Sequence, residues 1–140
     1  MSRAQPHWVP QRAVEAMQAE LIAEHGGLQG PARSSQLESA LARPQQLWHY
    51  AESSPALTRL AASYGHALAK GHCFPDGNKR MALAVMDVFL QMNGQEILAD
   101  EAEMAVVIES LAAGHLSEDA LATWLAEHVA KTPPEFPIGS

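Results

Sequence analysis

The residues best suited to chemistry lie in one stretch, HCFPDGNKR, at positions 72–80. Its last residues begin an apolar helical pattern, and the first turn of a helix carries unpaired backbone N–H groups and about half a positive charge. Such a turn binds anions, and Gly77 lets the backbone come close to one. Asn78, Lys79 and Arg80 add side-chain donors and two positive charges. This donor set suits several linked phosphates better than one small anion.

Two other residues of the stretch extend this chemistry. Asp76 supplies a carboxylate, and magnesium prefers one or two carboxylates together with phosphate oxygens. His72 is the residue type that accepts a proton near neutral pH. Residues 72–80 therefore offer a base, a metal ligand and an anion site.

Local charge favours an anionic ligand at this stretch. Residues 59–80 hold four basic residues and one acidic residue, a local charge of +3 in a chain whose formal charge is −7. A positive region in an acidic protein concentrates anions there. The overall negative charge disfavours binding to nucleic acids or to anionic membrane surfaces.

Other interpretations of the stretch are weaker. A purely structural turn should avoid two cations at a helix start, where the helix dipole opposes them. A metal site could use the ligand types His66, His72, Cys73 and Asp76. Their spacing matches no common zinc pattern. Cys73 as a nucleophile lacks a suitable base, since the adjacent His72 is badly placed for proton transfer.

Hydrophobic periodicity predicts an all-α chain of six helices and no convincing strand. We expect the helices over residues 9–25, 35–43, 54–70, 78–92, 100–113 and 117–129. The helix over 78–92 is apolar on most sides, so we expect it at the centre of the bundle. Only Gln95 to Leu98 could form a short extended piece.

Local signals set the expected helix ends. Ser35 with Glu38 forms a capping-box signature, Ser54 precedes Pro55 as a cap, and Asp100 and Ser117 are N-cap candidates. Pro44 is expected to end the second helix. Residues 44–54 are then expected to form a loop that exposes Trp48, His49 and Tyr50. These three side chains are candidates for a flap that holds a target peptide.

Size and composition fit one domain. The chain has 140 residues, 47% of them apolar and 18% charged, which is enough to fill a core. We assign residues 1–131 to the domain and 132–140, with three prolines, to a loose tail. No apolar run reaches membrane length and the N-terminus lacks a secretory pattern, so we expect a cytoplasmic protein. A single cysteine excludes an intramolecular disulfide.

The stretch HCFPDGNKR resembles the signature H-x-F-x-[DE]-[GA]-N-[GK]-R of the Fic/Doc (Fido) family, most closely its death-on-curing (Doc) branch. HGGLQG, LESALARP, ALAKGH before the motif and ALAVMDVFLQMNG after it are also similar to the Doc layout. The resemblance spans about residues 10 to 130 and implies a compact bundle of about six helices around a central buried helix.

Roles for the motif residues follow from the resemblance. It makes His72 the base that deprotonates a target hydroxyl, and Phe74 the anchor of the loop in the core. It makes Asp76 the magnesium ligand. It assigns the anion hole to Gly77 and Asn78, and the nucleotide phosphates to Lys79 and Arg80. The implied cofactors are ATP and Mg²⁺.

The Doc branch implies the toxin of a type II toxin-antitoxin system. A Phd-like segment of the antitoxin folds on the toxin surface. The residues expected to line an apolar groove for this segment are Trp8, Met17 and Trp48. Doc members carry Lys at the position of Lys79 and transfer the γ-phosphate of ATP to a threonine of elongation factor Tu, which arrests translation.

Two alternatives accompany this assignment. Fic members with Gly at the position of Lys79 transfer AMP, and Gly77 matches that branch, because the best-known Doc motif has Ala there. We weight Lys79 more, since its bulk and charge change which phosphate fits. The second alternative is a catalytically silent corepressor that only binds the antitoxin.

Overall fold

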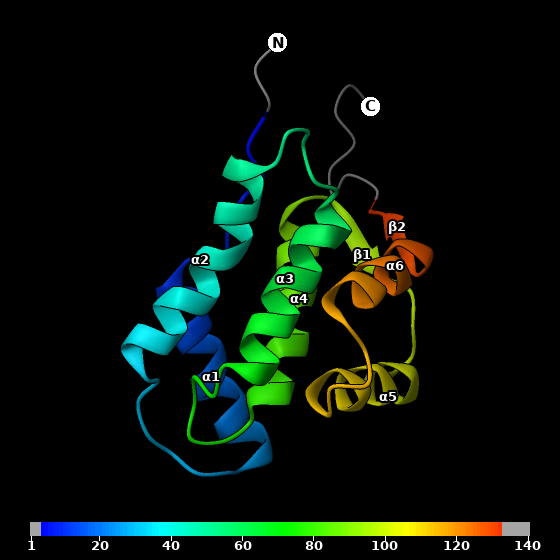
Figure 1. Cartoon of the computed structure of the whole chain (residues 1–140). Helices are drawn as coiled ribbons and strands as arrows, with labels where there is room; N and C mark the ends of the chain where they lie inside the picture. The colour runs from blue at the N-terminus through cyan, green and yellow to red at the C-terminus, as the bar shows by residue number, and fades with distance from the viewer. Residues whose placement is uncertain (1–3, 133–140) are drawn as a thin grey trace, which may run out of the picture.

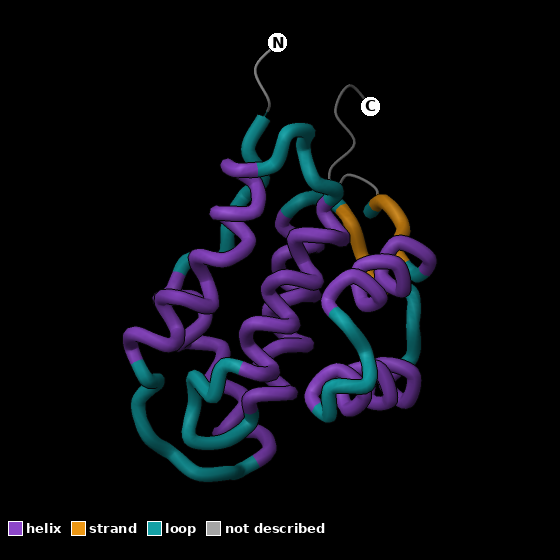
Figure 2. Tube along the Cα trace, viewed as in Figure 1, coloured by secondary structure: helices purple, strands orange, loops and turns teal. Residues whose placement is uncertain are grey.

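The computed structural model describes residues 4–132, which form six helices and one small sheet (Figures 1 and 2). The elements are α1 Gln11–His25, α2 Ser34–Tyr50, α3 Leu57–Lys70, α4 Asn78–Met92, β1 Gln95–Ile97, α5 Glu101–Ala112, α6 Glu118–Glu127 and β2 Val129–Lys131. The expected all-α fold is confirmed. The proposed tail over 132–140 lies outside the described residues except for Thr132.

The helices α3 and α4 form the middle of the bundle, with α1 and α2 on one flank and α5 and α6 on the other (Figure 1). Ten of the fourteen residues of α3 are buried, so α3 is more enclosed than α4. Close packing between them depends on Gly65, where a Cβ would collide with the thioether of Met86. The central position expected for residues 78–92 is therefore shared with α3.

The predicted end of the second helix at Pro44 is wrong. Pro44 lies inside α2 and is buried, although proline removes a helical hydrogen bond. The apolar face continues through it at helical spacing, since Leu41, Pro44 and Trp48 are all buried. Burial of this face against the core outweighs the lost bond.

Because α2 runs to Tyr50, residues 44–50 are no flap. Trp48 is only 6% exposed, whereas His49 and Tyr50 are exposed at the end of the helix. Of the other residues expected in an antitoxin groove, Trp8 stacks on Phe89 with ring centroids 5.9 Å apart. Met17 is half-buried and packs against the core.

Two of the four predicted caps are confirmed. The Asp100 carboxylate accepts the backbone N–H of Glu103 at 2.8 Å, and the Ser117 hydroxyl accepts that of Ala120 at 3.0 Å. The caps at Ser35 and Ser54 are wrong. The two helices begin at Ser34 and Leu57. Their N-cap residues are Arg33 and Ala56, and neither makes a side-chain cap bond.

The short extended piece expected at 95–98 exists as β1, and its partner β2 was not expected. The two strands pair antiparallel, with Gln95 opposite Lys131 and Ile97 opposite Val129. The last helix therefore ends at Glu127, two residues before the expected end.

The two ends of the bundle differ in structure. The connection between α1 and α2 and the loop between α3 and α4 lie together at one end, and the small sheet lies toward the other (Figure 2).

No helix among the described residues is long and apolar enough to cross a membrane.

Candidate active site

The motif forms the turn between α3 and α4. Its backbone is unusual at two places: Gly77 caps α4 in the left-handed conformation, at φ 74° and ψ 22°, and His72 has a φ of 51°. A positive φ is uncommon for a residue other than glycine, and such residues cluster at functional sites. This turn leaves the side chain of His72 exposed.

Two buried residues fix the turn to the core. Cys73 is fully buried and Phe74 is 2% exposed. Burial raises the pKa of the Cys73 thiol, so the thiol stays protonated, which is unfavourable for a nucleophile. Among residues 4–132 no three His, Cys, Asp or Glu side chains gather as a metal site.

Asn78 braces the turn with its side chain. Its Oδ1 accepts the backbone N–H of Phe74 at 3.0 Å, and its Nδ2 donates to the carbonyl of Phe74 at 3.0 Å. The amide that the family resemblance assigns to the anion hole is thus bonded to the loop itself. An anion can still meet the second N–H of Nδ2 and the backbone N–H of Asn78.

Three backbone donors are open at the start of α4. The first helical bond of this turn runs from the N–H of Met81 to the carbonyl of Gly77 at 2.8 Å. The N–H groups of Asn78, Lys79 and Arg80 therefore have no intrahelical partner. They converge on the dipole-positive end of the helix, which is the geometry of an anion site.

Asp76 lies beside these donors, and its carboxylate accepts two backbone N–H bonds. Oδ2 accepts from Leu28 at 3.1 Å and Oδ1 from Gly77 at 2.9 Å. These two bonds, in that order, lower the pKa of Asp76, and the charge of Arg80 adds to the effect. The ionised, exposed carboxylate keeps lone pairs free. It therefore fits a magnesium site completed by phosphate oxygens.

The connection between α1 and α2, residues 26–33, is part of this site and was missed as such. Besides the Leu28 bond, the N–H of Arg33 donates to the carbonyl of Cys73 at 2.7 Å. A Cβ at Gly27 would lie 2.9 Å from Oδ2 of Asp76, so only glycine fits this approach without a shift. The segment HGGLQG, with its paired glycines, was the signal in the sequence.

A cavity of about 720 Å³ opens over the turn, hereafter the phosphate cavity. Its lining includes residues 75–80 of the motif, the end of α1 and one face of α5. It thus brings together Asp76, Gly77, Asn78, Lys79 and Arg80. His72 does not line it and lies on the other side of the buried pair Cys73 and Phe74 in the chain.

Lys79 reaches across the phosphate cavity to α5. Its Nζ is 2.6 Å from Oε1 of Glu109, and both side chains are about half exposed. An exposed pair of this kind contributes only about 0.2–1 kcal/mol, so a polyphosphate can displace it. Glu109 was missed by the sequence analysis, because nothing in its own segment distinguishes it from other exposed helical glutamates.

Comparisons with known proteins agree with this geometry. A model of the Fic/DOC family matches residues 8–90, which is more than half of the chain. The chain is 35% identical over 104 residues to "Protein kinase doc" of Escherichia phage P1, covering 74% of this chain and 81% of that protein. It is 41% identical over 64 residues to "Toxin Doc" of Mycolicibacterium smegmatis, covering 46% of this chain and 49% of that protein. The family match includes the whole turn from His72 to Arg80, and the chain therefore belongs to the Fic/Doc family, in its Doc branch.

Proposed function

We propose that the protein is the toxin of a type II toxin-antitoxin system and acts in the cytoplasm as a Doc-type protein kinase. It transfers the γ-phosphate of ATP to a Ser or Thr hydroxyl of a translation factor, elongation factor Tu, and so arrests translation. A Phd-like segment of the cognate antitoxin restrains it. The relative named "Protein kinase doc" supports this assignment.

One observation carries the proposal. Three open N–H groups, the cations Lys79 and Arg80 and the ionised Asp76 line one cavity of about 720 Å³. The backbone donors are fixed before a triphosphate binds, and the positive charge needs only the exposed Lys79–Glu109 pair to open. It also leaves a carboxylate for the metal that accompanies the phosphates.

The chain's residues divide the reaction between them. The open N–H groups of α4 and Arg80 hold the phosphates, while the Asn78 brace keeps the turn in shape. Magnesium at Asp76 would neutralise charge on the phosphate oxygens. His72 takes the proton of the acceptor hydroxyl as its oxygen bonds to the γ-phosphorus. The bond from that phosphorus to the bridging oxygen breaks, and ADP leaves.

A second candidate is transfer of AMP to the hydroxyl, and the position of Lys79 favours it. The Lys79 side chain points toward Glu109 on α5 and leaves the open N–H groups of α4 uncovered. We expected phosphoryl transfer because a lysine at this position would fill part of the anion hole. The Lys79 side chain lies against Glu109 instead, which weakens that reason.

Growth arrest tests whether the protein acts as an enzyme at all. Expression without antitoxin should stop growth, and His72→Ala or Arg80→Ala should abolish the arrest while the circular dichroism spectrum stays unchanged. His49→Ala is the matched control, because His49 is exposed at the end of α2 and outside the site. Arrest that persists in the His72 and Arg80 variants would contradict the catalytic roles of these residues, and no arrest by the wild-type protein would favour the silent corepressor.

A further inference from the structure

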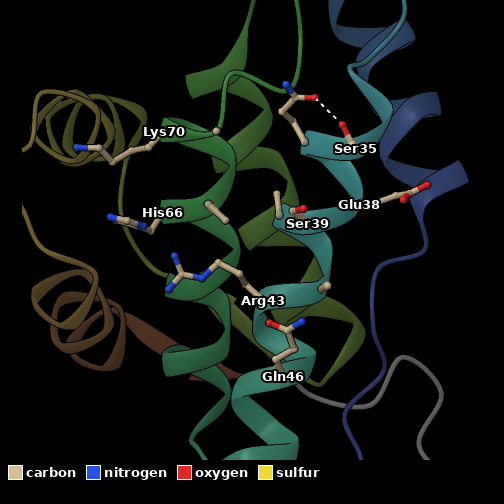
Figure 3. A pocket seen from close by; sticks show the side chains of 12 residues that line it. Ser35, Glu38, Ser39, Arg43, Gln46, His66 and Lys70 are labelled. Carbon is tan, nitrogen blue, oxygen red and sulfur yellow. Dashed lines mark hydrogen bonds between the residues drawn. The ribbon is translucent and has the colours of Figure 1, made fainter.

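A second cavity lies outside the phosphate site. It measures about 910 Å³ and opens between α2 and α3 (Figure 3). Polar residues from Ser35 to Gln46 line it on α2, and His66, Lys70 and Gly71 line it on α3. We call it the α2–α3 groove. Nothing in the family motif accounts for it.

The groove ends beside the base. Gly71, the lining residue that follows α3, directly precedes His72 in the chain. The groove shares no lining residue with the phosphate cavity, whose motif residues begin at Pro75. His72 lines neither cavity, but the segment that carries it runs from Gly71 at the groove to Pro75 at the phosphate cavity.

Basic side chains gather on one side of the groove. In Figure 3, Arg43, His66 and Lys70 extend to the same side, whereas Glu38 points the opposite way. Glu38 is the only carboxylate in the lining. The cations that a bound ligand meets are therefore Arg43 of α2, which Glu118 bonds, and Lys70 of α3.

Neighbouring acids neutralise this cluster only in part. Glu118 of α6 bonds Arg43 at 2.9 Å and Arg59 at 2.6 Å, so two guanidinium groups share one carboxylate. Asp119 lies 3.4 Å from Arg59 but is 86% exposed. The ion pairs of the described residues include no carboxylate partner for the exposed Lys70.

His66 adds a polar group to the groove and no charge at neutral pH. Its Nδ1 is 3.4 Å from Glu118 but makes no hydrogen bond. Burial lowers the pKa of His66, an effect that Glu118 opposes and that the nearby cations Arg43, Lys70 and Arg59 reinforce. Because the imidazole ring of His66 is neutral, the positive charge of the groove comes from Arg43 and Lys70.

We propose that the α2–α3 groove binds an acidic segment of the acceptor protein and delivers its hydroxyl to His72. This inference rests on the proposed function and adds the class of substrate segment. Hydroxyl and amide groups on α2 can bond a peptide backbone, while Lys70 and Arg43 attract its carboxylates. The groove lining holds two cations, Arg43 and Lys70, too few for the run of phosphates in a nucleic acid, so a short acidic peptide fits better.

Lys70→Glu tests the groove with little risk to the fold, since the Lys70 side chain is exposed. With elongation factor Tu as acceptor and labelled ATP, this variant should raise the KM for the acceptor roughly tenfold, equivalent to about 1.4 kcal/mol. The KM for ATP and the kcat should not change. Lys131→Glu is the matched control, because it makes the same charge change in β2, at the other end of the bundle.

A binding measurement keeps this inference separate from the proposed function. A fluorescent Glu-rich peptide should bind the wild-type protein, lose roughly tenfold in affinity with Lys70→Glu and weaken with added salt. The same peptide with Gln in place of Glu should not bind. This readout needs no catalysis, so it holds or fails even if no phosphate is transferred.

Three outcomes would overturn the groove assignment. The first is equal affinity of the Glu-rich peptide for both proteins. The second is a raised KM for ATP in Lys70→Glu, which would assign Lys70 to the nucleotide. The third is loss of antitoxin affinity with an unchanged KM for the acceptor, which would give the groove to the antitoxin.

Discussion

The carboxylate of Asp76 accepts the backbone N–H of Leu28 at 3.1 Å, so the proposed magnesium ligand also fastens the connection between α1 and α2 to the turn at residues 72–80. The side chain of Leu28 is 65% exposed and adds little burial to hold the connection. The attachment therefore depends on two backbone hydrogen bonds to the turn, from Leu28 to the charged Asp76 carboxylate and from Arg33 to the carbonyl of Cys73.

The pH dependence of stability should reflect this attachment. The pKa of Asp76 in the folded protein is below its ordinary value of 3.8, so the unfolded chain binds a proton first as the pH falls. The contribution of Asp76 is present above pH 3.8 and is lost as the pH falls through the lowered pKa. Urea unfolding of wild type and Asp76→Asn should therefore differ most near neutral pH and converge in acid. A difference that grows toward low pH would contradict the sign of the shift.

Two glycines of the site should respond differently to alanine. Both have positive φ, which costs alanine about 1–2 kcal/mol of stability. A Cβ at Gly77 meets nothing within 4 Å, whereas a Cβ at Gly27 would lie 2.9 Å from Oδ2 of Asp76. Gly77→Ala should be less stable but retain magnesium-dependent transfer, and Gly27→Ala should lose most of it. Equal activities of the two variants would remove Gly27 from the site.

Glu109→Gln should strengthen nucleotide binding. The change removes a negative charge from the wall of the phosphate cavity and releases Lys79 from its pair at 2.6 Å. Since an exposed pair contributes about 0.2–1 kcal/mol, the KM for ATP should fall by at most about fivefold, and by about 1.4-fold at the lower limit. Glu127→Gln, at the exposed end of α6, is the matched control. A KM that stays equal or rises would mean that Glu109 does not compete with phosphate.

Tyr64→Phe should destabilise the fold without touching the site. The Tyr64 hydroxyl accepts the backbone N–H of Val9 at 3.1 Å, and Val9 is only 2% exposed. Phenylalanine leaves that buried N–H without a partner, which costs about 1–3 kcal/mol of unfolding free energy. Burial raises the pKa of Tyr64 to about 12. An unchanged denaturation midpoint would show that Val9 finds another acceptor.

Features fixed by local chemistry could be predicted from the sequence. The turn at 72–80 was identifiable because its residue types and its glycine have few uses other than binding phosphate. The caps at Asp100 and Ser117 bond residues only three positions away. Such contacts depend on the segment itself and not on how helices pack.

Features fixed by packing could not be predicted. The course of α2 through Pro44 depends on burial against α3, and β2 exists only because β1 offers a partner 32 to 36 residues earlier in the chain. Glu109 meets Lys79 across 30 residues, at a distance set by how α5 packs on α4. Each of these outcomes needs a tertiary contact that no local pattern encodes.

The most direct test supplies the purified protein with magnesium, elongation factor Tu and ATP labelled on either the γ- or the α-phosphate. The kinase assignment predicts label on the factor from γ-labelled ATP alone, and none with His72→Ala. Label from α-labelled ATP would contradict phosphoryl transfer and establish AMP transfer, while label from neither would contradict both.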